Sequence, residues 1–158
     1  MKFFAVTLAL LAGLASVCSA GVGEPAPGFI GRQPDGKLFR LSDNAGPKII
    51  NFFLDTCVPC IAELPELAAM EKKYPDVKFI AVHIEQKPES VIIEFLARLK
   101  GYPGKVVIGN SRIAEMYEVK SVPHTVAVDG SENIVLSLAG YTKANIAALE
   151  KWLAQNKR

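Results

Sequence analysis

The stretch NFFLDTCVPCIAELPEL, residues 51–67, places Cys57 and Cys60 between an apolar run and a helical pattern. The run KIINFFL at 48–54 is dominated by apolar residues, which is typical of a strand buried on both faces. Residues 59–73 then carry apolar side chains at helical spacing. The cysteine pair therefore stands where a buried strand leads into a helix. Three roles are open to such a pair, namely a structural disulfide, half of a metal site or a catalytic dithiol.

The rest of the chain alternates strand and helix patterns. In chain order we expect a hairpin at 29–41 around Asp35-Gly36, the strand at 48–54, the helix at 59–73 kinked by Pro65, a strand at 77–84, a helix at 88–101 ended by Gly101, a strand at 105–109, a helix at 112–119, two strands within 125–140, and a helix at 142–157 capped by Thr142. This order predicts an α/β fold in which a central mixed β-sheet is flanked by helices and extended by the N-terminal β-hairpin.

The N-terminal stretch MKFFAVTLALLAGLASVCSAG has the layout of a secretory signal peptide. Lys2 gives a short basic start, residues 3–14 form the apolar segment, and Cys18-Ser19-Ala20 is a small-residue cleavage site before Gly21. The apolar segment is shorter than the roughly 18 residues that a membrane-spanning helix needs, which disfavours an uncleaved anchor. We therefore expect residues 1–20 to be removed on export to the periplasm or another extracytoplasmic compartment.

Removal of 20 of the 158 residues leaves 138, from 21 to 158, which is enough for one domain with a sizeable core. Of the 18 Lys and Arg residues only Lys2 is lost, so 17 basic residues face 16 acidic ones without a basic run, which argues against a nucleic-acid partner. Cys18 leaves with the signal, and a lipid anchor on it is disfavoured because Val17 stands where a small residue is expected. The exported chain keeps two cysteines, and we expect it to be a monomer.

The position of the pair at a helix start favours a catalytic dithiol. A thiol there faces unpaired N–H groups and the positive end of the helix dipole, which favour the thiolate of Cys57. Cys60 lies deeper in the first turn and within disulfide distance, and is the expected resolving thiol. A structural bridge over so small a loop would stabilise the fold only weakly. A structural zinc site, which closes with four ligands, is disfavoured because the sequence has no second cysteine pair and only His83 and His124 remain.

The segment IINFFLDTCVPCIAELPEL resembles the active-site segment of TlpA/ResA-type proteins, which are exported bacterial thiol-disulfide oxidoreductases with a thioredoxin-like fold. The similarity extends over nearly the whole exported chain, from GEPAPGF and DGKLFRLSD through SVPHTVAVDG to the last helix. The C-x-x-C pair alone is a weak signal. Together with the strand before it, the helix after it and the Val-Pro-x-Thr segment further along, it is specific.

The resemblance implies further site residues. Cys57 matches the exposed nucleophile of the family, and Cys60 matches its buried resolving thiol. Pro123 matches the cis-proline that lies against the dithiol, and a cis bond there exposes the backbone of Val122 as a short edge that can pair with a substrate chain. Val58-Pro59, inside the motif, is expected to adjoin the substrate as well.

Glu63 matches an acidic residue found near the dithiol in many ResA-like proteins. It stands three residues after Cys60, on the same helix face, and is the expected proton relay for the buried sulfur. A solvated helix glutamate is the alternative. Asn51 stands where thioredoxins carry a buried aspartate, which shifts the acidic role toward Glu63.

Two positions depart from the common family pattern. Thr56 stands where many relatives have tryptophan, which reduces the hydrophobic rim that contacts partners. His124 follows Pro123 where threonine is common, and a cationic His124 in contact with the dithiol and substrate would favour the Cys57 thiolate. His83 ends a buried strand and is expected to be a hydrogen-bonded structural histidine.

The resemblance implies protein disulfide substrates, a membrane electron donor for re-reduction, no cofactor and no metal, with apocytochrome c as the leading substrate by analogy with cytochrome c maturation. We predict a thiol-disulfide oxidoreductase that acts as a disulfide reductase through a mixed disulfide. The alternative is a Cu(I)-binding or metallochaperone module that uses the two thiolates and His124. A thiol peroxidase, suggested by PAPGF and LSD, needs Thr or Ser three residues before its reactive cysteine, whereas Leu54 precedes Cys57 by three.

Overall fold

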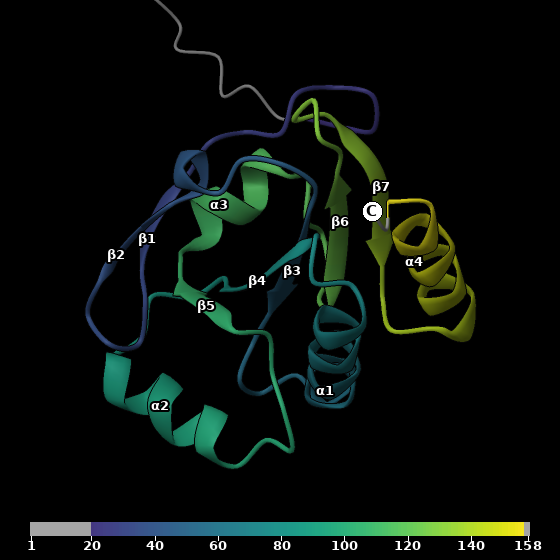
Figure 1. Ribbon diagram of the computed structural model, residues 1–158. Helices are drawn as coiled ribbons and strands as arrows, with labels where there is room; N and C mark the ends of the chain where they lie inside the picture. Colours follow the sequence, from purple (N-terminus) through teal and green to yellow (C-terminus); the bar gives the residue numbers. More distant parts are fainter. Residues whose placement is uncertain (1–19, 157–158) are drawn as a thin grey trace, which may run out of the picture.

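In residues 20–156, which the computed structural model describes, seven strands form one mixed sheet in the order β2-β1-β5-β4-β3-β6-β7 (Figure 1). The strands are β1 (Ile30–Arg32), β2 (Leu38–Arg40), β3 (Lys48–Phe53), β4 (Lys78–His83), β5 (Lys105–Ile108), β6 (His124–Val128) and β7 (Ile134–Ala139). β3, β4 and β5 run parallel, β6 and β7 add antiparallel strands on one side, and the β1–β2 hairpin adds to the other. The predicted mixed sheet with an N-terminal hairpin is confirmed.

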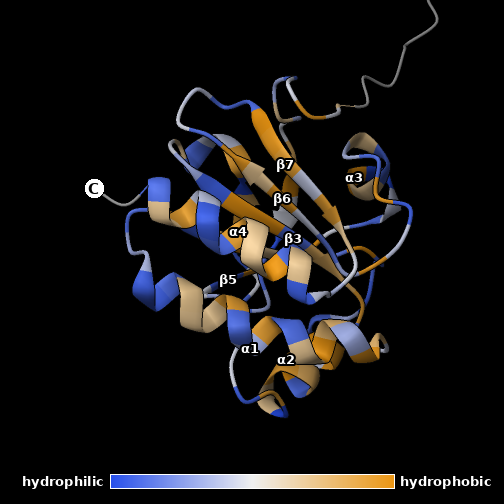
Figure 2. Cartoon of the chain, turned by 90° about the vertical axis from the view of Figure 1, so that its right-hand side faces the viewer, coloured by the Kyte–Doolittle hydropathy of each residue, from blue (hydrophilic) through white to orange (hydrophobic). Residues whose placement is uncertain are grey.

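Four α-helices in the described part of the chain cover the sheet (Figures 1 and 2). They are α1 (Val58–Lys73), α2 (Glu89–Ala97), α3 (Ser111–Met116) and α4 (Lys143–Gln155), and a short 3-10 helix, Leu41–Asp43, follows β2. α1, α2 and α4 pack on one face of the sheet, while α3 packs on the opposite face together with the hairpin. Figure 2 shows α1 and α4 with both hydrophilic and hydrophobic segments, as expected for helices with one buried side.

The central strand β3 brings the chain to the cysteine pair. All six of its residues are buried, as its apolar sequence predicted. Side chains alternate across a strand, so Asn51 and Phe53 face α1 while Phe52 faces the layer that contains α3. The register pairs Asn51 with Thr125 of β6. This pairing places two polar side chains on the same side of the sheet, beneath α1.

Helix ends differ in part from the sequence-based prediction. α2 ends at Ala97 and not at Gly101, which does not take the positive φ of a glycine cap, so that prediction was wrong. α3 begins one residue earlier than expected, because the Asn110 side chain caps it by accepting the N–H of Ile113 at 3.1 Å. α1 continues through Pro65 as a single helix.

The start of the described chain is tied to α3 and β7. The N–H of Ala20 donates to Met116 O at 3.0 Å, and the N–H of Gly23 donates to Ile134 O at 2.8 Å. The predicted signal peptide lies outside the described residues except for Ala20, so its removal stays a prediction. No helix within residues 20–156 has the length and apolar character needed to cross a membrane.

Candidate active site

A disulfide joins Cys57 and Cys60 at the N-terminus of α1, with the two Cα atoms 5.2 Å apart. Cys57 is the N-cap residue, and its Sγ accepts a hydrogen bond from the N–H of Cys60 at 3.2 Å. Cys60 is fully buried, whereas Cys57 is partly exposed beside Val58, which is 75% exposed. An incoming chain therefore meets the sulfur of Cys57 first. This is the asymmetry expected of an attacking and a resolving thiol.

The first turn of α1 favours negative charge on Cys57. Pro59 stands in that turn, where its missing N–H has no helical partner to lose. The turn contains no acidic residue that would oppose the field of the helix. The unpaired N–H groups and the helix dipole therefore stabilise a Cys57 thiolate when the disulfide is reduced.

The peptide bond between Val122 and Pro123 is cis, as predicted. Val122 packs against the buried cluster that contains Cys60, and Cys57 packs against the same cluster. Pro123 O accepts the N–H of Gly140 at 2.8 Å, whereas the main-chain groups of Val122 have no hydrogen-bond partner within residues 20–156. A substrate chain can therefore pair with free backbone groups beside the dithiol.

Glu63 is a buried acid on the helix that carries the dithiol, with only 3% of its surface exposed. Its Oε2 accepts a hydrogen bond from Asn51 Nδ2 at 2.8 Å, and its Oε1 accepts one from Thr125 Oγ1 at 3.2 Å. Asn51 Nδ2 also donates to Thr125 Oγ1 at 2.9 Å. The carboxyl is thus fixed between one helix and two strands. Its burial contradicts the alternative of a solvated helix glutamate.

The surroundings of Glu63 favour its protonated form. Burial raises the pKa of Glu63 above the ordinary value for glutamate. The hydrogen bonds from Asn51 and Thr125 act in the opposite direction without cancelling the effect, and the charge of Glu66 adds to the rise. A carboxyl with such a raised pKa exchanges its proton closer to neutral pH, which suits proton transfer to and from a thiol.

Asn51 can adapt to both protonation states of Glu63. In the observed orientation its amide donates to the carboxyl, which suits an ionised Glu63. Its Oδ1 is buried and has no hydrogen-bond partner among the described residues. Rotation of the amide by half a turn would present Oδ1 as an acceptor to a protonated Glu63. The neutral residue thus supports proton exchange without adding a second charge.

His124 faces away from Glu63. Its Nε2 lies 2.8 Å from Ser137 Oγ, and its ring packs edge-on against Phe52 with the ring centroids 6.5 Å apart. The residue is 6% exposed, and its Nδ1 is buried without a partner in the part of the chain described. Burial lowers the pKa of His124, so the neutral ring is favoured. The structure therefore gives no support to a cationic His124 beside the dithiol.

His83 ends β4 as a buried and hydrogen-bonded histidine, as predicted. Its Nδ1 lies 2.7 Å from Glu85 O, and its Nε2 lies 3.1 Å from Asp55 Oδ1. Across residues 20–156, no group of three or more His, Cys, Asp or Glu side chains is placed to hold a metal ion. The Cu(I) alternative with the two thiolates and His124 therefore finds no support in this geometry.

Comparison with known proteins agrees with this site. Residues 22–137 match the AhpC/TSA family. The thiol:disulfide interchange protein DsbE homolog of Paracoccus denitrificans is 31% identical over 148 residues, which cover 86% of this chain and 79% of that protein. The thiol-disulfide oxidoreductase ResA of Bacillus subtilis is 26% identical, with 84% and 73% covered. A crystal structure from Chlorobium tepidum, assigned as a thiol:disulfide interchange protein DsbE, is similar with a TM-score of 0.77 and 25% identity over 87% of this chain and 98% of its own.

The fold and the dithiol define a thiol-disulfide oxidoreductase with a thioredoxin-like fold. The chain belongs to the AhpC/TSA family, and its relatives are of the DsbE and ResA type, as the resemblance predicted. Leu54 stands where a thiol peroxidase needs Thr or Ser, so membership of the family does not imply a peroxidase site in this chain.

Three contributors near the dithiol were not predicted from the sequence. Thr125 follows His124 in β6, and strand alternation was the signal that places it on the side of α1. Asp55 and Lys87 form an ion pair at 3.0 Å across 32 positions of sequence, and no motif connects them.

Proposed function

We propose that the chain is a protein disulfide reductase that acts outside the cytoplasm, with Cys57 as the attacking thiol and Cys60 as the resolving thiol. One observation carries this proposal, which is the unequal exposure of the two cysteines at the start of α1. The buried carboxyl of Glu63 on the same helix supports it, because resolution requires the second thiol to lose a proton.

In the first step the Cys57 thiolate attacks one sulfur of a protein disulfide. The substrate S–S bond breaks, and the second substrate sulfur leaves and takes up a proton. In the next step the Cys60 thiol gives its proton to the Glu63 carboxylate and attacks Cys57 Sγ. The mixed disulfide breaks, the remaining substrate sulfur leaves and takes up a proton, and the Cys57–Cys60 disulfide forms. The substrate gains two electrons from the dithiol and two protons. One proton balances the proton that Cys60 gives to Glu63, and the other comes from solvent, because Cys57 begins as the thiolate.

The exposed surface around Cys57 is the proposed binding site for the substrate chain. Val58 and Pro59 supply apolar contact area beside the sulfur. The main chain of Val122 pairs with the substrate backbone, and Pro123 holds Val122 in place. His124 has little exposed area, so its proposed role is to support the neighbouring Pro123 by packing and not to contact the substrate.

The partners follow by analogy with the relatives, whose names describe thiol:disulfide interchange and thiol-disulfide oxidoreduction. The proposed substrate is apocytochrome c, whose C-x-x-C-H cysteines must be reduced before haem is attached. A membrane electron donor would restore the dithiol. The signal peptide at residues 1–20 would deliver the chain to the periplasm, where it acts as a monomer.

The test uses the reduced protein and a disulfide-bonded peptide that contains C-x-x-C-H. Reduction of the peptide should proceed in step with oxidation of the Cys57–Cys60 pair, followed by mass spectrometry. The two-electron potential of the protein gives the direction, since about −270 mV marks a reductant such as thioredoxin and about −120 mV an oxidant such as DsbA. We expect a value near the reducing end. A value near the oxidising end, or no transfer to the peptide, would contradict the proposal.

A further inference from the structure

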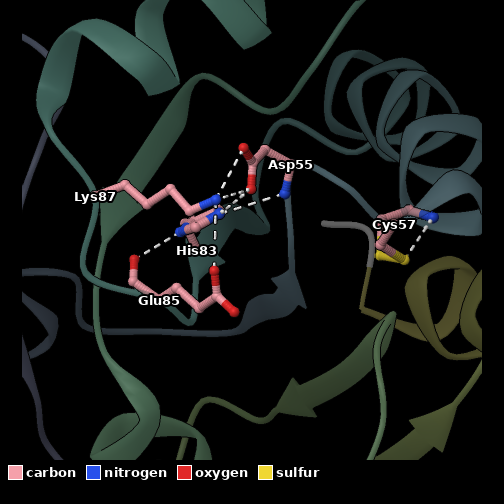
Figure 3. A network of polar contacts seen from close by, with 6 residues as sticks. Asp55, Cys57, His83, Glu85 and Lys87 are labelled. Atoms are coloured by element: carbon pink, nitrogen blue, oxygen red, sulfur yellow. Dashed lines mark hydrogen bonds and ion pairs between the residues drawn. A yellow bond between two sulfur atoms is a disulfide. The ribbon is translucent and has the colours of Figure 1, made fainter.

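A second polar cluster lies beside the dithiol and has no part in the mechanism above (Figure 3). Asp55 lies in the turn between β3 and α1, His83 ends β4, and Glu85 and Lys87 lie in the loop before α2. Lys87 Nζ is 3.0 Å from Asp55 Oδ1 and 3.5 Å from Glu85 Oε2. The side chain of His83 is fully buried, and those of Asp55 and Lys87 are 13% and 27% exposed.

Hydrogen-bond chemistry gives His83 two alternative partners. Its Nδ1 carries a hydrogen, because the Glu85 carbonyl oxygen at 2.7 Å can only accept. Its Nε2 lies between two groups of Asp55, the main-chain N–H at 3.3 Å and the carboxylate Oδ1 at 3.1 Å. A neutral ring accepts the N–H but sets its lone pair against the carboxylate. A protonated ring donates to the carboxylate but leaves the N–H without this acceptor.

Which group of Asp55 binds His83 matters for the reactive sulfur, because Asp55 belongs to the turn that ends at Cys57. The N–H of Cys57 donates to Leu54 O at 3.2 Å, which makes Asp55 and Thr56 the central residues of the turn. Figure 3 shows the Asp55 carboxylate directed toward Lys87 and His83, with Cys57 on the other side of Asp55. A hydrogen bond that fixes the main chain of Asp55 therefore also fixes the N-cap residue of α1.

Charge provides a second link to the sulfur. Burial alone would raise the pKa of Asp55, but the contacts with Lys87 and His83 outweigh burial and hold this pKa below the ordinary value for aspartate. Asp55 is therefore an anion two residues from Cys57. The charged groups that face His83 are Asp55 from the β3–α1 turn and Glu85 and Lys87 from the β4–α2 loop.

We propose that Asp55, His83 and Lys87 are positioning residues that tune the redox potential of the dithiol. Lys87 neutralises the Asp55 carboxylate, which would otherwise destabilise the nearby Cys57 thiolate. His83 anchors the turn by accepting the main-chain N–H of Asp55. The inference rests on the proposed function in one respect, that Cys57 is the sulfur ionised in the dithiol form.

The first test compares Lys87→Gln with Lys37→Gln, which breaks the exposed pair with Asp35 in the β1–β2 turn. Each variant is equilibrated with glutathione at pH 7, which needs no protein substrate and stays valid if the chain is not a protein disulfide reductase. Lys87→Gln should make reduction about two- to threefold less favourable, a potential about 9 to 14 mV more negative, because the thiolate loses a compensating charge. Lys37→Gln should match the wild type. Equal constants for the two variants would overturn the proposal.

The second test measures the same glutathione equilibrium for His83→Asn, which removes the ring nitrogen that lies 3.3 Å from the main-chain N–H of Asp55. Loss of this anchor should make reduction about twofold less favourable, because the N-cap residue of α1 is held less firmly. An equilibrium constant equal to that of the wild type would remove His83 from the proposed tuning site.

Discussion

Asn51 Nδ2 lies 2.8 Å from Glu63 Oε2, so a neutral amide on the central strand holds the buried carboxyl of the helix that carries the dithiol. Thr125 completes the arrangement from β6. These contacts keep the carboxyl in surroundings where burial disfavours its charge and raises its pKa. Glu63 is therefore placed to exchange a proton at higher pH than an exposed glutamate would.

The first prediction concerns Glu63→Gln, which keeps the size of the side chain but cannot exchange a proton. We expect the rate at which Cys60 resolves a mixed disulfide to fall by about tenfold or more at pH 7. In the wild type this rate should rise with pH through an ionisation above the ordinary range of glutamate, because the carboxylate is the proton acceptor. The glutamine variant should lack this ionisation. Quenched-flow measurements of the resolution rate from about pH 5 to pH 9, for the wild type and for Glu63→Gln, test this prediction.

Glu66→Gln is the matched control on the exposed side of the same helix. The charge of Glu66 raises the pKa of Glu63, so its removal should move the ionisation to lower pH without abolishing it. If the ionisation persists in Glu63→Gln, another group is the proton acceptor.

The second prediction concerns the roles of the two sulfurs. Cys60→Ser removes the resolving thiol, so mixed disulfides through Cys57 should accumulate with partner proteins. Cys57→Ser leaves a fully buried Cys60, which should trap little or nothing. Non-reducing gels of each variant purified from the extracytoplasmic fraction show the difference. Similar trapping by both variants would contradict the assignment of Cys57 as the attacking thiol, which rests on its greater exposure.

The dithiol could be located from the sequence because its signals are local. A buried strand, a C-x-x-C pair and a helix start follow one another within a short segment, and the Val122-Pro123 pair lies in a second one. The contact between Asn51 and Thr125 joins residues 74 positions apart and depends on the register of β3 against β6. No local pattern encodes that register, so the contacts of Thr125 with Asn51 and Glu63 were not predicted, although Thr125 belongs to the Val-Pro-x-Thr segment and Glu63 was identified.

The expected positive charge of His124 finds no support in the structure, for a related reason. Its place beside Pro123 was visible in the sequence, but its burial against Phe52 and Ser137 is a product of tertiary packing. Burial opposes the charge that its position alone suggested. Proximity along the chain thus predicted the neighbourhood of the residue but not its electrostatics.

The third prediction follows from this burial. Burial lowers the pKa of His124, so any effect of His124→Thr on the redox potential should be the same at pH 6 and at pH 8. The hydrogen bond to Ser137 should instead contribute about 1 kcal/mol to the free energy of unfolding. Ser137→Ala, which removes only the partner, should lower that free energy by a similar amount and leave the potential unchanged. A change of the redox potential in His124→Thr at pH 6 but not at pH 8 would instead support a positively charged His124.

The last prediction concerns the end of β3 remote from the dithiol, where the fully buried side chain of Lys48 pairs with the Glu132 carboxylate. Glu132 Oε1 also accepts the N–H of Gly46 at 3.1 Å. Removing one partner of a buried ion pair costs about 3 to 5 kcal/mol, but Glu132 is 47% exposed, so Glu132→Gln should lower the free energy of unfolding by about 1 to 3 kcal/mol. Lys48→Met removes the buried charge together with its desolvation penalty and should cost less, and urea unfolding compares the two.

The glutathione equilibrium of both variants should match the wild type, because Lys48 begins β3 and Cys57 follows its other end. The reverse ranking of the two variants would mean that the ion pair of Lys48 stabilises the fold by more than the desolvation of its ammonium group costs.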